Sequence, residues 1–141
     1  MIKIAHRGNT QGTSDKENSP QHIMHALIMG LDVEVDVWLT EDGLFLGHDQ
    51  PTYKMPRLFL EDLSERFWFH CKNLEALNYF SLNLGHLKYF WHESDRYTMV
   101  SNGVIWAYPG QRVLSNCIIV DLDNKDGNED AIGVCSDFWP V

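Results

Sequence analysis

The chain has 141 residues, 44% of them hydrophobic, and a formal net charge of −9 at pH 7. This length and composition are typical of a single folded domain spanning residues 1–141, and the composition is not that of a disordered chain. The acidic charge argues against general binding to nucleic acid, whose phosphates require a basic surface.

The sequence shows neither a membrane span nor an export signal. Its apolar runs are shorter than the roughly 18 residues that a spanning helix needs. Polar side chains, His6 and Arg7 among them, stand where a signal peptide would be apolar. The three cysteines lack CxxC spacing, so we expect buried, reduced thiols and a cytoplasmic protein.

The first elements follow a strand–helix–strand order. Residues 2–5 form an apolar run that predicts a buried strand. A capping serine, a first-turn proline and a following glycine predict a helix over 20–29. The alternating stretch 32–39 predicts a second strand, with valines on one face and Glu34 and Asp36 on the other. This order favours a parallel strand pair with a right-handed crossover.

The rest of the chain continues the alternation, which indicates an α/β fold. Further strands are expected at 44–48, 67–72, 87–93, 103–108, 117–122 and 132–138, and helices near 60–67 and over 74–84. Polar residues stand where several strands end, which is where a parallel barrel forms its active site. They are His6, Asp36, Lys72, Glu93, Asp121 and Asp137. We therefore predict a reduced TIM-type (β/α) barrel with short connections in its second half.

Glu34 and Asp36 are candidate metal ligands. Alternation along a strand places their carboxylates on one face, about 7 Å apart. Two negative charges this close are stable together when a cation lies between them. Oxygen ligands suit a hard ion such as Mg²⁺ or Ca²⁺. The alternative is a solvent-facing strand with ordinary acidic residues.

His6, Arg7 and His48 are candidates for phosphate chemistry. Histidine can act as a general acid or base near neutral pH. The Arg7 guanidinium can bind a phosphate through paired hydrogen bonds. Either histidine alone is more often structural, but cleavage of a phosphodiester needs one group for each proton transfer. Two histidines flanking a carboxylate pair meet that need.

The motifs "AHRG", "ENS", "DVEVDV", "TEDG" and "HD", in this order and spacing over Ile4–Asp49, resemble the glycerophosphodiester phosphodiesterase family. That family belongs to the phospholipase-C-like phosphodiesterase superfamily of TIM barrels. Looser similarity, in "FHCK" and "GVCSDF", extends to the C-terminal part of the chain. The whole chain looks like a compact, divergent branch of this superfamily.

The resemblance implies a role for each candidate residue. The acid–base pair would be His6 and His48, the metal ligands Glu34 and Asp36, the phosphate-binding cations Arg7 and Lys72, and the supporting residues Glu17 and Asn18. Family chemistry favours His6 as the base and His48 as the acid, although the two roles can be exchanged.

His70 stands where the family has a third metal-binding carboxylate. Imidazole suits zinc, iron or manganese and is a poorer ligand for calcium. The expected cofactor is a divalent metal, with Mg²⁺ or Ca²⁺ first and Mn²⁺ or Zn²⁺ allowed by His70. A water molecule or Glu93 is an alternative third ligand.

These features predict a metal-dependent phosphodiester hydrolase acting on a small glycerophosphodiester-like substrate by acid–base catalysis with two histidines. One alternative is a non-catalytic phosphate-ligand-binding or assembly module derived from the same barrel. Another is a zinc hydrolase of a different fold. Missing helices would leave sheet edges uncovered, which favours a homo-oligomer.

Overall fold

The computed structural model describes residues 1–125, 127 and 129–140. Within these residues the chain forms ten β-strands, two α-helices and two short 3₁₀ helices. The strands are β1 (Ile2–His6), β2 (Asp32–Thr40), β3 (Gly43–Leu46), β4 (Tyr53–Lys54), β5 (Phe67–Cys71), β6 (Tyr89–Trp91), β7 (Tyr97–Met99), β8 (Ile105–Ala107), β9 (Cys117–Val120) and β10 (Gly133–Ser136). The helices are α1 (Pro20–Ile28), α2 (Leu74–Asn83), η1 (Arg57–Phe59) and η2 (Ser64–Arg66).

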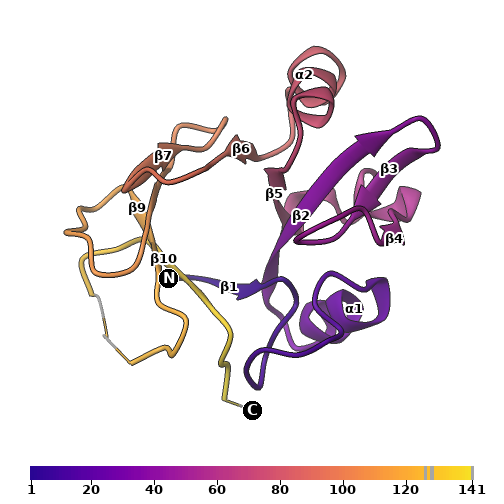
Figure 1. Cartoon of the computed structure of the whole chain (residues 1–141). Helices are drawn as coiled ribbons and strands as arrows, with labels where there is room; N and C mark the ends of the chain where they lie inside the picture. The colour runs from indigo at the N-terminus through magenta and orange to yellow at the C-terminus, as the bar shows by residue number, and fades with distance from the viewer. Residues whose placement is uncertain (126, 128, 141) are drawn as a thin grey trace.

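The strands form one curled, mixed sheet (Figure 1). Parallel pairs connect the strands in the order β8-β9-β10-β1-β2-β5-β6. Antiparallel strands β3 and β4 extend the sheet beside the second half of β2, and β7 pairs antiparallel with β8. The last strand pairs directly with the first in the middle of the sheet, with Ile4 opposite Cys135.

The predicted TIM-type (β/α) barrel is wrong. The sheet is a curled, mixed half-barrel, and the described chain has only two α-helices instead of a helix after each strand. From β6 onward, turns and irregular segments connect the strands. The connection 92–96 is too short for a helix, and Pro109 and Gly110 form a turn in the connection after β8.

Both α-helices begin where the sequence indicates. The side chain of Ser19 accepts a hydrogen bond from the His22 backbone N–H, and Asn73 caps α2 in the same way. The helices pack against β2, with α2 also contacting β5 and β6 (Figure 1). The helix predicted near 60–67 is reduced to the single 3₁₀ turn η2, because residues 60–63 form turns and β5 begins at Phe67.

The sheet has apolar side chains on both faces. A large core lies between the sheet and the helices, and a smaller cluster fills the inside of the curl. Trp68, Phe90 and Trp106 are the largest members of that inner cluster, and their rings are in contact. Polar residues lie on the same face at both ends: Asp32 accepts a hydrogen bond from Trp68 Nε1 at the amino end of β2, and Glu34 lies nearer the carboxyl end.

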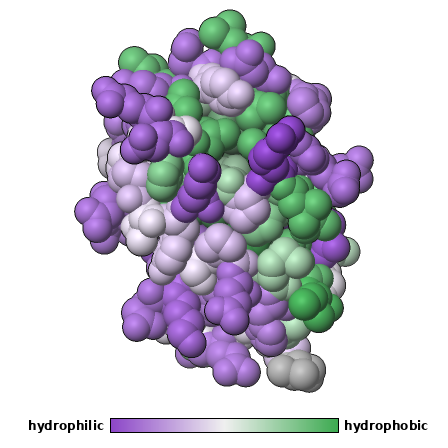
Figure 2. All heavy atoms as spheres, turned by 90° about the vertical axis from the view of Figure 1, so that its right-hand side faces the viewer, coloured by the Kyte–Doolittle hydropathy of each residue, from purple (hydrophilic) through white to green (hydrophobic). Residues whose placement is uncertain are grey.

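The surface and the cysteines agree with a folded, reduced chain. Figure 2 shows one face on which hydrophilic side chains predominate and hydrophobic ones gather in smaller groups. Cys71, Cys117 and Cys135 are buried and free, as predicted. In the described part of the chain, neither helix has the length and apolar composition to cross a bilayer.

Candidate metal and acid–base site

A cavity of about 540 Å³ lies at the carboxyl ends of the parallel strands. Because β1, β2, β5 and β6 run in the same direction, the residues at their ends meet around this space. The polar groups around it are His6, Arg7, Glu34, His48, His70, Lys72, His92 and Glu93. The predicted acid–base, phosphate and metal residues therefore lie on one cavity, except Asp36, which lies directly beside it.

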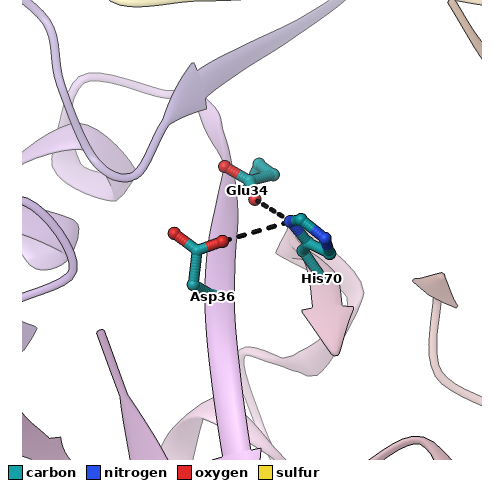
Figure 3. A group of neighbouring side chains, drawn as sticks. All are labelled: Glu34, Asp36 and His70. Carbon is teal, nitrogen blue, oxygen red and sulfur yellow. Dashed lines mark ion pairs between the residues drawn. The ribbon is translucent and has the colours of Figure 1, made fainter. Parts of the chain in front are cut away.

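Glu34, Asp36 and His70 form a three-residue cluster (Figure 3). Alternation along β2 places both carboxylates on its inner face, and the β2–β5 register places His70 opposite Asp36. One candidate ligand atom from each residue lies within 4.8 Å of the others. His70 Nδ1 is 3.1 Å from Asp36 Oδ1 and 3.8 Å from Glu34 Oε1. Separate strands thus bring one nitrogen and two carboxylates together.

The two carboxylates are buried and incompletely satisfied. Glu34 is 3% exposed and Asp36 is fully buried. Among the described residues, Glu34 Oε2 and Asp36 Oδ1 have no hydrogen-bond partner. Burial and the Asp36 charge raise the pKa of Glu34. Burial acts on Asp36 too, but the nearby imidazoles and Arg7 lower the pKa of Asp36 below its usual range. Orphaned carboxylate oxygens of this kind fit a bound cation.

Asn18 holds Asp36 in place. Its side-chain amide donates to Asp36 Oδ2 at 3.0 Å, and the Asp36 backbone N–H donates to Asn18 Oδ1 at 2.9 Å. Asn18 is fully buried and has a φ of 66°, in the left-handed region that asparagine tolerates better than most residues. The supporting role predicted for Asn18 therefore has a structural basis in these two bonds.

Replacing Asn18 should separate the contribution of its two hydrogen bonds to stability from that of its left-handed backbone conformation. Asn18→Gly keeps the left-handed backbone but removes both hydrogen bonds, so the free energy of unfolding should fall by about 1–3 kcal/mol. Asn18→Ala should lose about 1 kcal/mol more, because a Cβ is strained at positive φ. Urea denaturation of both variants measures this difference. Equal stability of the alanine and glycine variants would contradict the strain argument.

His6 is oriented by a residue from the other end of the chain. Its Nδ1 lies 2.8 Å from Asp137 Oδ1, and its Nε2 lies 3.8 Å from Glu34 Oε2. Burial alone would lower the pKa of His6, but the Asp137 hydrogen bond and the Glu34 charge raise it above its ordinary value. Since a carboxylate accepts the Nδ1 proton, Nε2 is the atom available for proton exchange in the cavity.

The buried side-chain amide of Asn9 connects the His6–Asp137 pair to the rest of the site. Asn9 donates to Asp137 Oδ1 at 2.8 Å and to Glu17 Oε1 at 3.0 Å, and its Oδ1 lies 2.9 Å from His22 Nε2. The sequence placed Asp137 among the polar residues at the strand ends without a specific role, and it did not single out Asn9 or His22. A polar residue following the last strand was the available signal for Asp137, and nothing local pointed to Asn9.

Arg7 and His48 meet above the Asp36 carboxylate. Arg7 Nε and His48 Nδ1 lie 3.2 Å and 3.5 Å from Asp36 Oδ2. The Arg7 guanidinium also donates to Glu17 Oε2 at 3.0 Å and approaches His48 Nε2 at 3.4 Å. Its charge is thus shared among protein carboxylates. The His48 side chain is 40% exposed, so this imidazole is open to the cavity and to solvent.

Other parts of the cavity lining supply a cation and aromatic rings. Lys72 lines the cavity and forms no ion pair with the residues that the structure describes, so its ammonium is free for an anion. The rings of His92 and Tyr108 stack with centroids 3.5 Å apart, beside Trp106. Glu93 also lines the cavity but lies outside the three-residue cluster. His70 therefore occupies the third position of the cluster.

No protein-family model, curated protein or solved structure matches this chain. The functional argument accordingly depends on the geometry of the site and on the motifs of the sequence.

Proposed function

We propose that this protein is a metal-dependent phosphodiester hydrolase with a small, glycerophosphodiester-like substrate. One observation carries the proposal: a cation-ready cluster of Glu34, Asp36 and His70 lies within the same site as two histidines and a free lysine. Phosphate binding alone does not require two histidines beside a metal cluster. The motif resemblance over Ile4–Asp49 points to the same chemistry.

Glu34, Asp36 and His70 would hold the metal. Their orphaned oxygens and close spacing support a divalent cation. Such an ion would polarise a phosphate oxygen and lower the pKa of a coordinated water or hydroxyl. Asn18 keeps Asp36 oriented toward the cluster, so the ligand set is preorganised.

The two histidines divide the proton transfers. His6 acts as the base: Asp137 holds its Nδ1, the raised pKa makes it a stronger proton acceptor, and Nε2 faces the cavity. His48 acts as the acid toward the departing alkoxide. It contacts both Asp36 and Arg7 and reaches solvent, from which it can be reprotonated.

Lys72 and the remaining N–H groups of Arg7 balance the phosphate charge. The cavity volume of about 540 Å³ suits a small phosphodiester, with Trp106 and Tyr108 beside one alcohol group. Where that group carries a hydroxyl next to the ester, the hydroxyl can attack internally and form a cyclic phosphate first. A glycerol phosphodiester has such a hydroxyl.

The proposal is tested by hydrolysis assays on metal-stripped protein. Bis(p-nitrophenyl) phosphate and glycerophosphodiesters are supplied as substrates, and Mg²⁺, Ca²⁺, Mn²⁺ and Zn²⁺ are restored one at a time. We expect no turnover without metal and turnover with at least one ion. Lys72→Ala should raise KM for the glycerophosphodiester, because the free cation binds its phosphate.

The controls separate the alternatives. An exposed-lysine variant, Lys125→Ala, should behave like wild type, since its ammonium lies on the surface. A folded protein that binds phosphate but gives no turnover with any ion would instead be a binding or assembly module. Cleavage of carboxylic esters but not of phosphodiesters, with rescue by zinc alone, would indicate a zinc hydrolase of another kind.

A further inference from the structure

The orientation of the His70 ring determines which of its nitrogens can bind a metal. Nε2 lies 3.4 Å from the backbone carbonyl oxygen of His92. A carbonyl only accepts hydrogen bonds, so Nε2 carries a hydrogen in this contact. The ring is also held by stacking on Phe90, with centroids 5.0 Å apart and an interplanar angle of 10°. Nδ1 is therefore the nitrogen presented to the cluster.

Nδ1 points at two acceptors (Figure 3). It faces Asp36 Oδ1 at 3.1 Å and Glu34 Oε1 at 3.8 Å, and both carboxylates are at least nine-tenths buried. A neutral ring with its hydrogen on Nε2 carries a lone pair on Nδ1, and this lone pair and the carboxylate oxygens repel one another unless a proton or a metal cation lies among them. Metal-binding histidines in proteins typically donate their second ring N–H to a carbonyl or carboxylate. His70 and the His92 carbonyl have this arrangement.

We propose that this site selects a first-row transition ion, of the class of Zn²⁺ or Mn²⁺, over Mg²⁺ and Ca²⁺. Hard ions prefer oxygen ligands throughout, whereas imidazole nitrogen favours transition ions. One of the three protein donors is an imidazole that the fold holds in a ligand orientation. This inference rests on the proposed function and names the ion class of the same site. It reverses the order expected from the sequence, in which Mg²⁺ or Ca²⁺ came first.

The test measures binding without turnover. The metal-stripped 141-residue chain is dialysed against equimolar Zn²⁺, Mn²⁺, Mg²⁺ and Ca²⁺, and bound metal is quantified by elemental analysis. Thermal unfolding is followed with each ion alone. We expect about one equivalent of Zn²⁺, Mn²⁺ binding once Zn²⁺ is omitted, and higher Tm values with these two ions. Uptake of Mg²⁺ or Ca²⁺ in preference, or of no metal, would overturn the proposal.

Variants locate the selectivity. His70→Glu should lower the ratio of Zn²⁺ to Mg²⁺ affinity by at least about 10-fold. His70→Gln should also weaken Zn²⁺ binding. Because it adds no third negative charge beside Glu34 and Asp36, it should disturb folding less than His70→Glu does. His86→Glu alters an exposed histidine away from the cluster and should leave the ratio unchanged. An unchanged ratio in both His70 variants would refute the assignment.

The ion selectivity and the activity can fail separately. Selective Zn²⁺ or Mn²⁺ binding without hydrolysis of any phosphodiester would support the ion assignment and reject the proposed function. Hydrolysis supported by Mg²⁺ or Ca²⁺ but not by transition ions would support the proposed function and reject the ion assignment.

Discussion

His6→Ala should abolish most phosphodiester turnover while leaving metal binding intact. A positioned general base contributes about 10²–10⁴-fold to a reaction, and His6 holds that role in the proposed mechanism. Its imidazole is outside the metal cluster, so the variant should still bind one ion. The measurement is kcat with the restored metal, together with metal stoichiometry by elemental analysis.

Asp137→Asn is the matched variant for this prediction. It keeps the His6 ring but replaces the carboxylate that raises the pKa of His6 and accepts its Nδ1 proton. We expect a smaller loss of kcat and a pH–rate profile shifted to lower pH, because the imidazole becomes a weaker base. His25→Ala changes an exposed histidine on α1 and should retain full activity. Full activity in His6→Ala would reject the base assignment.

Glu34→Gln should eliminate metal binding and stabilise the metal-free protein. The pKa of Glu34 is raised by burial and by Asp36, so ionising this carboxyl group opposes folding when no cation is present. Glutamine has nearly the same shape without the charge. The free energy of unfolding of the metal-free variant should therefore rise, on the order of 1 kcal/mol.

Metal addition should reverse that order of stability. Wild type should gain about 2.7 kcal/mol when the free ion is at 100 times its Kd, whereas Glu34→Gln should gain nothing. Urea denaturation with and without metal measures both effects. Glu41→Gln, an exposed residue just beyond the same strand, should match wild type in each condition. If the metal-free Glu34→Gln protein is less stable than wild type, then burial of this carboxylate without a cation does not lower the free energy of unfolding, and the prediction is contradicted.

Local sequence patterns predicted the elements that build one side of the site. Period-two alternation at 32–39 placed Glu34 and Asp36 on one face, and the structure retains that face in β2. Capping residues located both helices. These signals are reliable because they depend on neighbours within a few residues of one another. The parallel pairing of β1 and β2 followed from the strand–helix–strand order, in which α1 crosses between them.

The parts that the sequence alone determined are therefore the strand faces, the helix starts and the grouping of the candidate residues at strand ends. Only the tertiary structure decided the fold class and the supporting contacts. The expected barrel is a curled, mixed half-barrel, and Asp137 reaches His6 across 131 positions of the chain. Strand pairings and hydrogen bonds at such separations depend on how the whole sheet curls. No local pattern encodes that curl, because it results from packing all the strands together.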